Sequence, residues 1–188
     1  MVDLIDAAFD LQHLLDARHF RFAFIGGLAV QSWGEPRLTR YIDLSLLTGF
    51  GGEERFADAL LTHYEPRMAG AKEFALAHRV LLLKAKGGIG IDVSFAALPY
   101  EERVVDRAIL VELLPARELR LCSPEDLIIM KLFAGREIDL RDARSVIVRQ
   151  GADRLDWDYM ERNLSEFGAV KEEAGLIDAL TRMRNSTQ

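Results

Sequence analysis

The sequence is short of several residue types, and each shortage excludes a class of protein. Its single cysteine, Cys122, excludes an internal disulfide and any zinc site made of several cysteines. With only 5 prolines and 14 glycines among 188 residues, the chain is neither collagen-like nor of low complexity. It has no apolar run near the roughly 18 residues of a transmembrane helix, and its N-terminus is acidic where a signal peptide is basic. We therefore expect a soluble, cytoplasmic protein with no membrane partner.

Positive charge is scarce as well. Lysine and arginine total 24 against 30 acidic residues, which gives a net charge of −6 and a pI of about 5.3. This balance argues against a protein that coats nucleic acid by charge alone. Hydrophobic residues make up 49% of the chain, so a chain of this length can bury a core without disulfides.

Hydrophobic periodicity predicts mixed strands and helices in the first two-thirds of the chain and helices in the last third. We therefore predict an α+β fold, with a mixed sheet core and flanking helices in residues 1–122 and a helical C-terminal subdomain in residues 123–188. The predicted strands are 20–25, 42–47, 80–85, 89–95 and 109–113. The predicted helices are 3–18, 28–33, 53–63, 99–108, 123–135, 139–149, 156–167 and 170–183.

Two acidic residues interrupt otherwise apolar strands. Asp43 lies between Ile42 and Leu44, and Asp92 lies in residues 89–95 (IGIDVSF). A carboxylate in such a strand needs a partner, a metal or a cleft. Each acid alone fits an ordinary salt bridge, but two acids on separate strands of one small sheet favour a site for a hard cation such as Mg²⁺.

Gly26 and Gly27 follow the predicted strand 20–25 and precede the predicted helix 28–33. Two glycines at such a junction let backbone N–H groups approach an anion, and the N-terminus of the helix adds a favourable potential. An ordinary tight turn is the other interpretation of the pair.

Longer motifs join these residues into one pattern. They are FIGGLAV at 24–30, WGEPRLTRYIDL at 33–44, SPEDL at 123–127, AGR at 134–136 and DLRD at 139–142. Together they resemble the nucleotidyltransferase superfamily, and more narrowly its AbiEii-like branch of abortive-infection and toxin–antitoxin proteins. The resemblance covers about residues 20–150. That superfamily has a Gly-Gly or Gly-Ser turn, an Asp-x-Asp pair on the next strand and a third acid on a later strand.

The resemblance implies a reaction and a role for six residues. The reaction is Mg²⁺- or Mn²⁺-dependent transfer of a nucleoside monophosphate from a nucleoside triphosphate (NTP) to a hydroxyl acceptor. Asp43 and Asp92 match the second and third acids, so they are expected to be catalytic and to hold the metal, with Asp92 also helping to deprotonate the acceptor. The residues expected to bind the nucleotide are Gly26, Gly27, Lys131 and Arg136. For partners, the resemblance implies a tRNA or protein acceptor and an antitoxin-like protein, and leaves a small-molecule acceptor open.

One position departs from the superfamily pattern. The first acid of the Asp-x-Asp pair falls at Tyr41, whose phenol is neutral at pH 7 and a poor ligand for a hard cation. Three interpretations are open. The chain is a pseudoenzyme that binds a nucleotide or a partner without transferring anything, or it keeps weak activity with one metal held by Asp43, Asp92 and the triphosphate itself, or an acid such as Glu35 replaces the missing ligand. We expect a nucleotidyltransferase with an impaired metal site, with the pseudoenzyme as the alternative.

Basic residues elsewhere have two interpretations. Lys131 lies among apolar residues, so we expect its ammonium group to reach a cleft. The alternative is a solvated helix face on which Asp139 and Asp142 are ion-pair partners in weak surface pairs. Residues 64–90 carry five basic residues, Arg67 among them, against two acidic ones. This modest excess fits an RNA acceptor or a solvated strand face.

Overall fold

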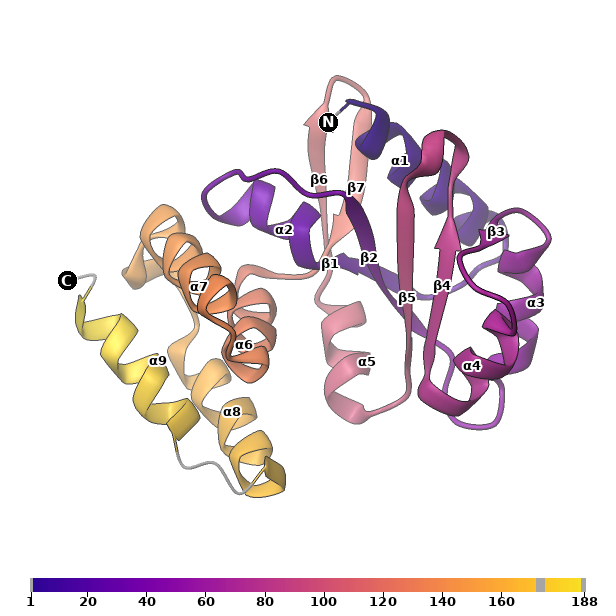
Figure 1. The fold of residues 1–188 in the computed structure, drawn as a ribbon. Helices are drawn as coiled ribbons and strands as arrows, with labels where there is room; N and C mark the ends of the chain where they lie inside the picture. The colour runs from indigo at the N-terminus through magenta and orange to yellow at the C-terminus, as the bar shows by residue number, and fades with distance from the viewer. Residues whose placement is uncertain (1, 172–174, 187–188) are drawn as a thin grey trace. The chain divides into compact units, whose positions relative to one another are not determined.

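The computed structural model describes residues 2–171 and 175–186 of the chain (Figure 1). The chain forms two compact units. The first, here the sheet unit, comprises Met1–Leu28 and Leu38–Cys122, and the second, the helical unit, comprises Ala29–Arg37 and Ser123–Gln188. The predicted α+β class is confirmed. Within the described ranges, no helix combines the length and the apolarity needed to cross a membrane.

A mixed seven-stranded sheet forms the centre of the sheet unit, in the order β3-β4-β5-β2-β1-β7-β6. Strand β1 pairs antiparallel with β2 and parallel with β7, while β2 pairs parallel with β5. The strands are β1 (Phe22–Ile25), β2 (Tyr41–Leu47), β3 (Glu65–Pro66), β4 (Val80–Lys84), β5 (Gly90–Ala96), β6 (Ile109–Leu114) and β7 (Arg117–Leu121).

The five predicted strands are confirmed, with small shifts of their ends. Strands β3 and β7 were not predicted. Two residues are too few to show a period, and in β7 the buried Leu119 and Leu121 alternate with charged residues over only five positions.

Helices of the sheet unit pack on this sheet: α1 against β7 and β2, α4 against β4, and α5 against β1 and β2. Helix α4 was not predicted; it has only eight residues, between left-handed residues at Gly70 and Arg79. A short 3₁₀ turn, Lys86–Gly88, links β4 to β5. The helices are α1 (Val2–Ala17), α3 (Glu53–Leu61), α4 (Ala71–His78) and α5 (Pro99–Asp106).

The two faces of β2 differ, and this difference positions the site. Ile42, Leu44 and Leu46 alternate on one face and are fully buried. Tyr41 and Asp43 lie on the other face, because side chains two apart on a strand point the same way; Tyr41 is exposed and Asp43 half-buried. The polar face of β2 is therefore available for chemistry, and its apolar face belongs to the core.

Helices make up most of the helical unit. Helix α2 (Gly26–Trp33) begins at the residue after β1, so its first residues, up to Leu28, belong to the sheet unit and the rest belongs to the helical unit. Gly26 and Gly27 therefore form the first turn of a helix and are not a separate loop. Ser123 caps α6 by accepting a hydrogen bond from the Asp126 N–H (3.1 Å), and Gly135 ends it in the left-handed region, in agreement with the predicted helix 123–135. The other members are α6 (Pro124–Ala134), α7 (Glu137–Gln150), the 3₁₀ turn Ala152–Arg154, α8 (Trp157–Lys171) and α9 (Gly175–Ser186).

The last predicted helix, 170–183, differs from the structure. Helix α8 continues to Lys171, beyond the predicted end at 167, and α9 begins only at Gly175. The predicted helix also includes residues 172–174, which lie outside the described residues. Leu176, Leu180 and Met183, at helical spacing, are the buried positions of α9.

Candidate functional site

The two predicted catalytic acids meet in the sheet unit. Strands β2 and β5 are parallel neighbours, and their register places Asp43 directly opposite Asp92. Register partners in adjacent strands point to the same face of a sheet. Both carboxylates are half-buried, and 36% of the Asp92 side chain is exposed. The two acids lie side by side on the polar face of two inner strands of the sheet. We call this pair, Asp43 and Asp92, the acidic edge.

The predicted glycine turn lies against Asp43. The Gly27 N–H donates a hydrogen bond to Asp43 Oδ2 at 3.2 Å. Gly26 has a φ of +59°, and a Cβ atom at this position would lie 2.1 Å from Asp43 Oδ2. A Cβ on Gly27 would lie 2.4 Å from Thr39 Oγ1. The sequence therefore needs both glycines here, because only a residue without a side chain allows such a close approach.

Tyr41 and Arg67 occupy the next position along this face. Tyr41 is the register partner of Gly90, and 46% of Tyr41 is exposed. The Arg67 guanidinium carbon lies 5.1 Å from the centre of the Tyr41 ring, and Arg67 Nη2 donates a hydrogen bond to Asp92 Oδ1. A guanidinium group therefore lies against Tyr41, the residue that the resemblance aligns with the first acid, and it is paired with Asp92, the expected third acid.

Burial shifts the protonation of Asp92. Its surroundings disfavour the ionised form and raise the pKa of this carboxyl above its usual range, although the positive charge of Arg67 acts in the opposite direction. A raised pKa makes a carboxylate a better proton acceptor.

A divalent metal fits these residues poorly. Mg²⁺ requires near-octahedral coordination by oxygen. Among residues 2–171 and 175–186, no group of three or more His, Cys, Asp or Glu side chains is placed to hold a metal. Asp43 and Asp92 supply two carboxylates, and Arg67 already contacts one of them. The residues do not fit the three-acid site that the resemblance implies.

The other two predicted nucleotide-binding residues, Lys131 and Arg136, lie in the helical unit. Lys131 Nζ lies 2.8 Å from both Asp139 Oδ1 and Asp142 Oδ2. Arg37 donates two hydrogen bonds of 2.9 Å to Asp142, and Arg136 pairs with Asp139. The Lys131 side chain is 9% exposed, whereas that of Arg136 is 72% exposed. Lys131 therefore pairs with the two aspartates named in the alternative, but in buried ion pairs and not on a solvated helix face.

The same ion pairs control the protonation of the two buried aspartates. Burial acts to raise both pKa values, but hydrogen bonds from Arg136 and Lys131 hold the pKa of Asp139 below its usual range. Those from Arg37 and Lys131 do the same for Asp142. Because the folded pKa is the lower one, this contribution to stability is present above the unfolded value of about 3.9. It is lost as the pH falls through the folded pKa.

Two further residues bear on the sequence predictions. Arg67 was predicted only as one of several basic residues and not as part of the acidic edge, since nothing in the local sequence links it to Asp92. Glu35, considered as a replacement ligand, lies in the helical unit, where its N–H donates a hydrogen bond to Ser145 Oγ at 3.0 Å.

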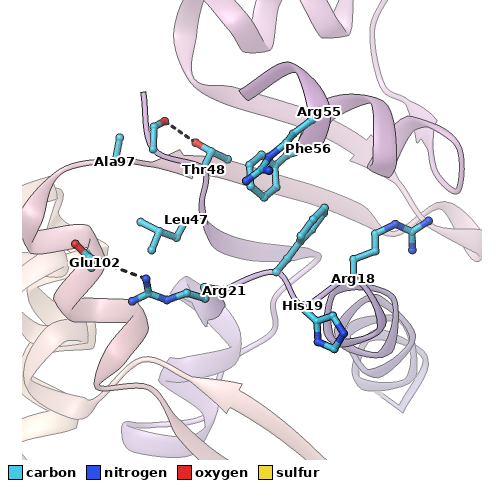
Figure 2. A pocket seen from close by; sticks show the side chains of 11 residues that line it. Arg18, His19, Arg21, Leu47, Thr48, Arg55, Phe56, Ala97 and Glu102 are labelled. Carbon is cyan, nitrogen blue, oxygen red and sulfur yellow. Dashed lines mark hydrogen bonds and ion pairs between the residues drawn. The ribbon is translucent and has the colours of Figure 1, made fainter. Parts of the chain in front are cut away.

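A separate cavity of about 480 Å³ lies at the other end of β2, where Leu47 leads into Thr48 (Figure 2). Arginines are prominent in its wall, but one of them, Arg21, donates hydrogen bonds to Glu102 at 3.1 Å and to Asp106. None of the predicted site residues lines this cavity. We therefore place the candidate site at the acidic edge.

Comparisons with known proteins find similarity to nucleotidyltransferases. Residues 92–182, just under half of the chain, match the family described as "Nucleotidyltransferase of unknown function (DUF6036)". No curated protein matches the chain in sequence. The solution structure of the antibiotic-resistance factor ANT(2'')-Ia is similar with a TM-score of 0.61 and 15% identity, over 91% of this chain and 96% of that one. An antigenic nucleotidyltransferase-like protein from Paracoccidioides brasiliensis is similar with a TM-score of 0.54 and 19% identity, over 95% and 92%. The chain therefore has the nucleotidyltransferase fold.

Proposed function

We propose that this chain binds an NTP at the acidic edge and is a nucleotidyltransferase with an impaired metal site. The observation that carries the proposal is the meeting of Asp43 and Asp92 in register, beside the Gly26–Gly27 turn, in a chain with the nucleotidyltransferase fold. Backbone N–H groups at the start of a helix suit phosphate groups. A carboxylate beside these N–H groups can accept the proton of a hydroxyl group.

The proposed reaction moves one nucleoside monophosphate. The acceptor oxygen forms a bond to the α-phosphorus, the bond from that phosphorus to the oxygen bridging to the β-phosphate breaks, and pyrophosphate leaves. The proton of the acceptor hydroxyl goes to the Asp92 carboxylate, whose raised pKa suits this role. Mg²⁺ or Mn²⁺ is the cofactor that the resemblance implies. Because the acids do not fit a three-carboxylate site, we expect transfer by the natural protein to be slow.

The acceptor and partner follow from the resemblance to the AbiEii-like branch. It favours a tRNA or a protein as acceptor and an antitoxin-like protein as partner. ANT(2'')-Ia is an antibiotic-resistance factor, so small hydroxylated molecules form a third acceptor class. Lys131 and Arg136 stay nucleotide-binding residues only as the resemblance implies. Arg136 is the more accessible of the two, whereas the ammonium group of Lys131 pairs with Asp139 and Asp142.

A second function is nucleotide or partner binding without transfer. The contact between Arg67 and Asp92 favours it, because it neutralises the acid assigned as proton acceptor. A pseudoenzyme would keep the fold and the Gly26–Gly27 turn and lose only the chemistry.

The test is transfer of label from each α-labelled NTP, with Mg²⁺ or Mn²⁺, to bulk tRNA, cell extract or small hydroxylated compounds. We expect slow transfer by the natural protein and none by the Asp43→Ala variant. Tyr41→Asp restores the first acid of the pair and should raise the rate at least about tenfold. The gain should be greater when Arg67→Gln is added, because Arg67 would otherwise pair with the new carboxylate.

One result would decide against transfer, and another against the assigned site. If Tyr41→Asp and Tyr41→Asp/Arg67→Gln are both silent with every acceptor while the natural protein still binds an NTP, the binding function is correct. If Asp43→Ala transfers as much label as the natural protein, the chemistry takes place elsewhere.

A further inference from the structure

Arg67 reaches Asp92 across one strand. Its backbone N–H donates a hydrogen bond to the Leu82 carbonyl oxygen at 3.0 Å, and Leu82 is the register partner of Asp92 between β4 and β5. The backbone thus holds residue 67 level with Asp92, with one strand between them. The guanidinium crosses the polar face of the sheet to the carboxylate, and 23% of the side chain is exposed.

Gly90 makes room for this arrangement. A Cβ atom on Gly90 would lie 2.5 Å from Tyr41 Cδ1 and 3.0 Å from Arg67 Nη1. The ring and the guanidinium therefore cover the α-carbon of Gly90, and any other residue would push them away. The ring face of Tyr41 attracts the cation. Tyr41, Arg67 and Gly90 together position the guanidinium of Arg67 against the Asp92 carboxylate.

We propose that Arg67 is the resident cation of the acidic edge and that it excludes divalent metal ions from Asp92. This inference rests on the proposed function only for the choice of site, since it concerns metal binding and not transfer. Guanidinium and metal ion compete for the same carboxylate oxygens. Mg²⁺ gives up its water reluctantly and needs several oxygen ligands at once. The guanidinium has an advantage, because the hydrogen bond from the Arg67 backbone N–H to Leu82 keeps residue 67 level with Asp92.

If Arg67 and a metal ion compete for Asp92, removal of Arg67 should raise the affinity for the metal ion. With Arg67 in place, a metal ion that approaches Asp92 meets the positive charge of the guanidinium paired with that carboxylate. Without Arg67, this positive charge no longer opposes the metal ion at Asp92. Removing a positive charge at hydrogen-bond distance should increase the affinity for a divalent ion at least about tenfold.

The experiment measures Mn²⁺ binding to the full chain without nucleotide, by calorimetry and by the electron paramagnetic resonance signal of free Mn²⁺. We expect the natural protein to bind Mn²⁺ at least about tenfold more weakly than Arg67→Gln and Arg67→Ala. Arg67→Lys keeps the charge and should stay weak. The double variant Arg67→Gln/Asp92→Asn should lose the gain, which assigns it to Asp92.

Arg21→Gln is the matched control. Arg21 also pairs with carboxylates in the sheet unit, Glu102 and Asp106, so a general effect of removing an arginine would appear there too. Equal Mn²⁺ affinity of the natural protein and both Arg67 variants overturns the proposal, as does a gain that survives Asp92→Asn. Circular dichroism checks that each variant is folded. Failure of the NTP transfer assay leaves this result unchanged, because no nucleotide is present.

Discussion

Lys131→Ala is expected to lower the free energy of unfolding of the helical unit by about 3 kcal/mol. The substitution takes the ammonium group from Asp139 and Asp142, whose side chains are 1% and 4% exposed. Removal of one partner from a buried ion pair leaves charge that the interior does not solvate. We expect the lower end of the usual range, because Arg37 and Arg136 still contact the two carboxylates.

Tryptophan fluorescence during urea unfolding measures this loss. Both tryptophans, Trp33 and Trp157, lie in the helical unit, so the signal reports on that unit. Arg141→Ala is the control on the same helix as the two aspartates. Arg141 is exposed, and its loss should change stability by no more than about 0.5 kcal/mol. Equal stability of Lys131→Ala and the natural protein would mean that the ion pairs contribute nothing.

Gly26→Ala is expected to weaken NTP binding and to destabilise the sheet unit by about 2–3 kcal/mol. An alanine at φ +59° is strained, and its Cβ would lie 2.1 Å from Asp43 Oδ2, so the carboxylate has to move. Gly49→Ala is a matched control: Gly49 has a φ of +70° and nothing within 4 Å of the added Cβ. The control carries the backbone strain, about 1–2 kcal/mol, without the clash.

Urea unfolding followed by circular dichroism and calorimetric titration with ATP separate the two effects. We expect Gly49→Ala to bind ATP like the natural protein and Gly26→Ala to bind at least about tenfold more weakly. If both variants lose the same stability and neither loses ATP binding, contact between the turn and Asp43 does not matter for the site.

Local signals were enough to predict much of the fold. The helix between Ser123 and Gly135 has a sequence signal at each end. The Ser123 side chain accepts a backbone hydrogen bond at its start, and Gly135 adopts the left-handed region at its end. The β2 strand shows its buried face through Ile42, Leu44 and Leu46. The same periodicity shows that Asp43 lies on the opposite face, which is why the acidic edge was predictable.

Pairing between distant residues was not predictable in the same way. Arg67 reaches Asp92 only because a two-residue strand, β3, places it level with Leu82, and so short a strand has no sequence signature. Lys131 was predicted either to reach a cleft or to lie on a solvated helix face, and the structure shows buried ion pairs instead. This outcome depended on how α6 and α7 pack, which places Asp139 and Asp142 beside it.

The most direct test of the proposed nucleotide site is an assigned ¹H–¹⁵N NMR spectrum of the natural protein titrated with each of the four NTPs. We predict that the largest shifts fall on the amides of Gly26 and Gly27 and on those of Asp43 and Asp92. Largest shifts at Thr48 and the other residues around the Figure 2 cavity, or no shift with any of the four, would contradict an NTP site at the acidic edge.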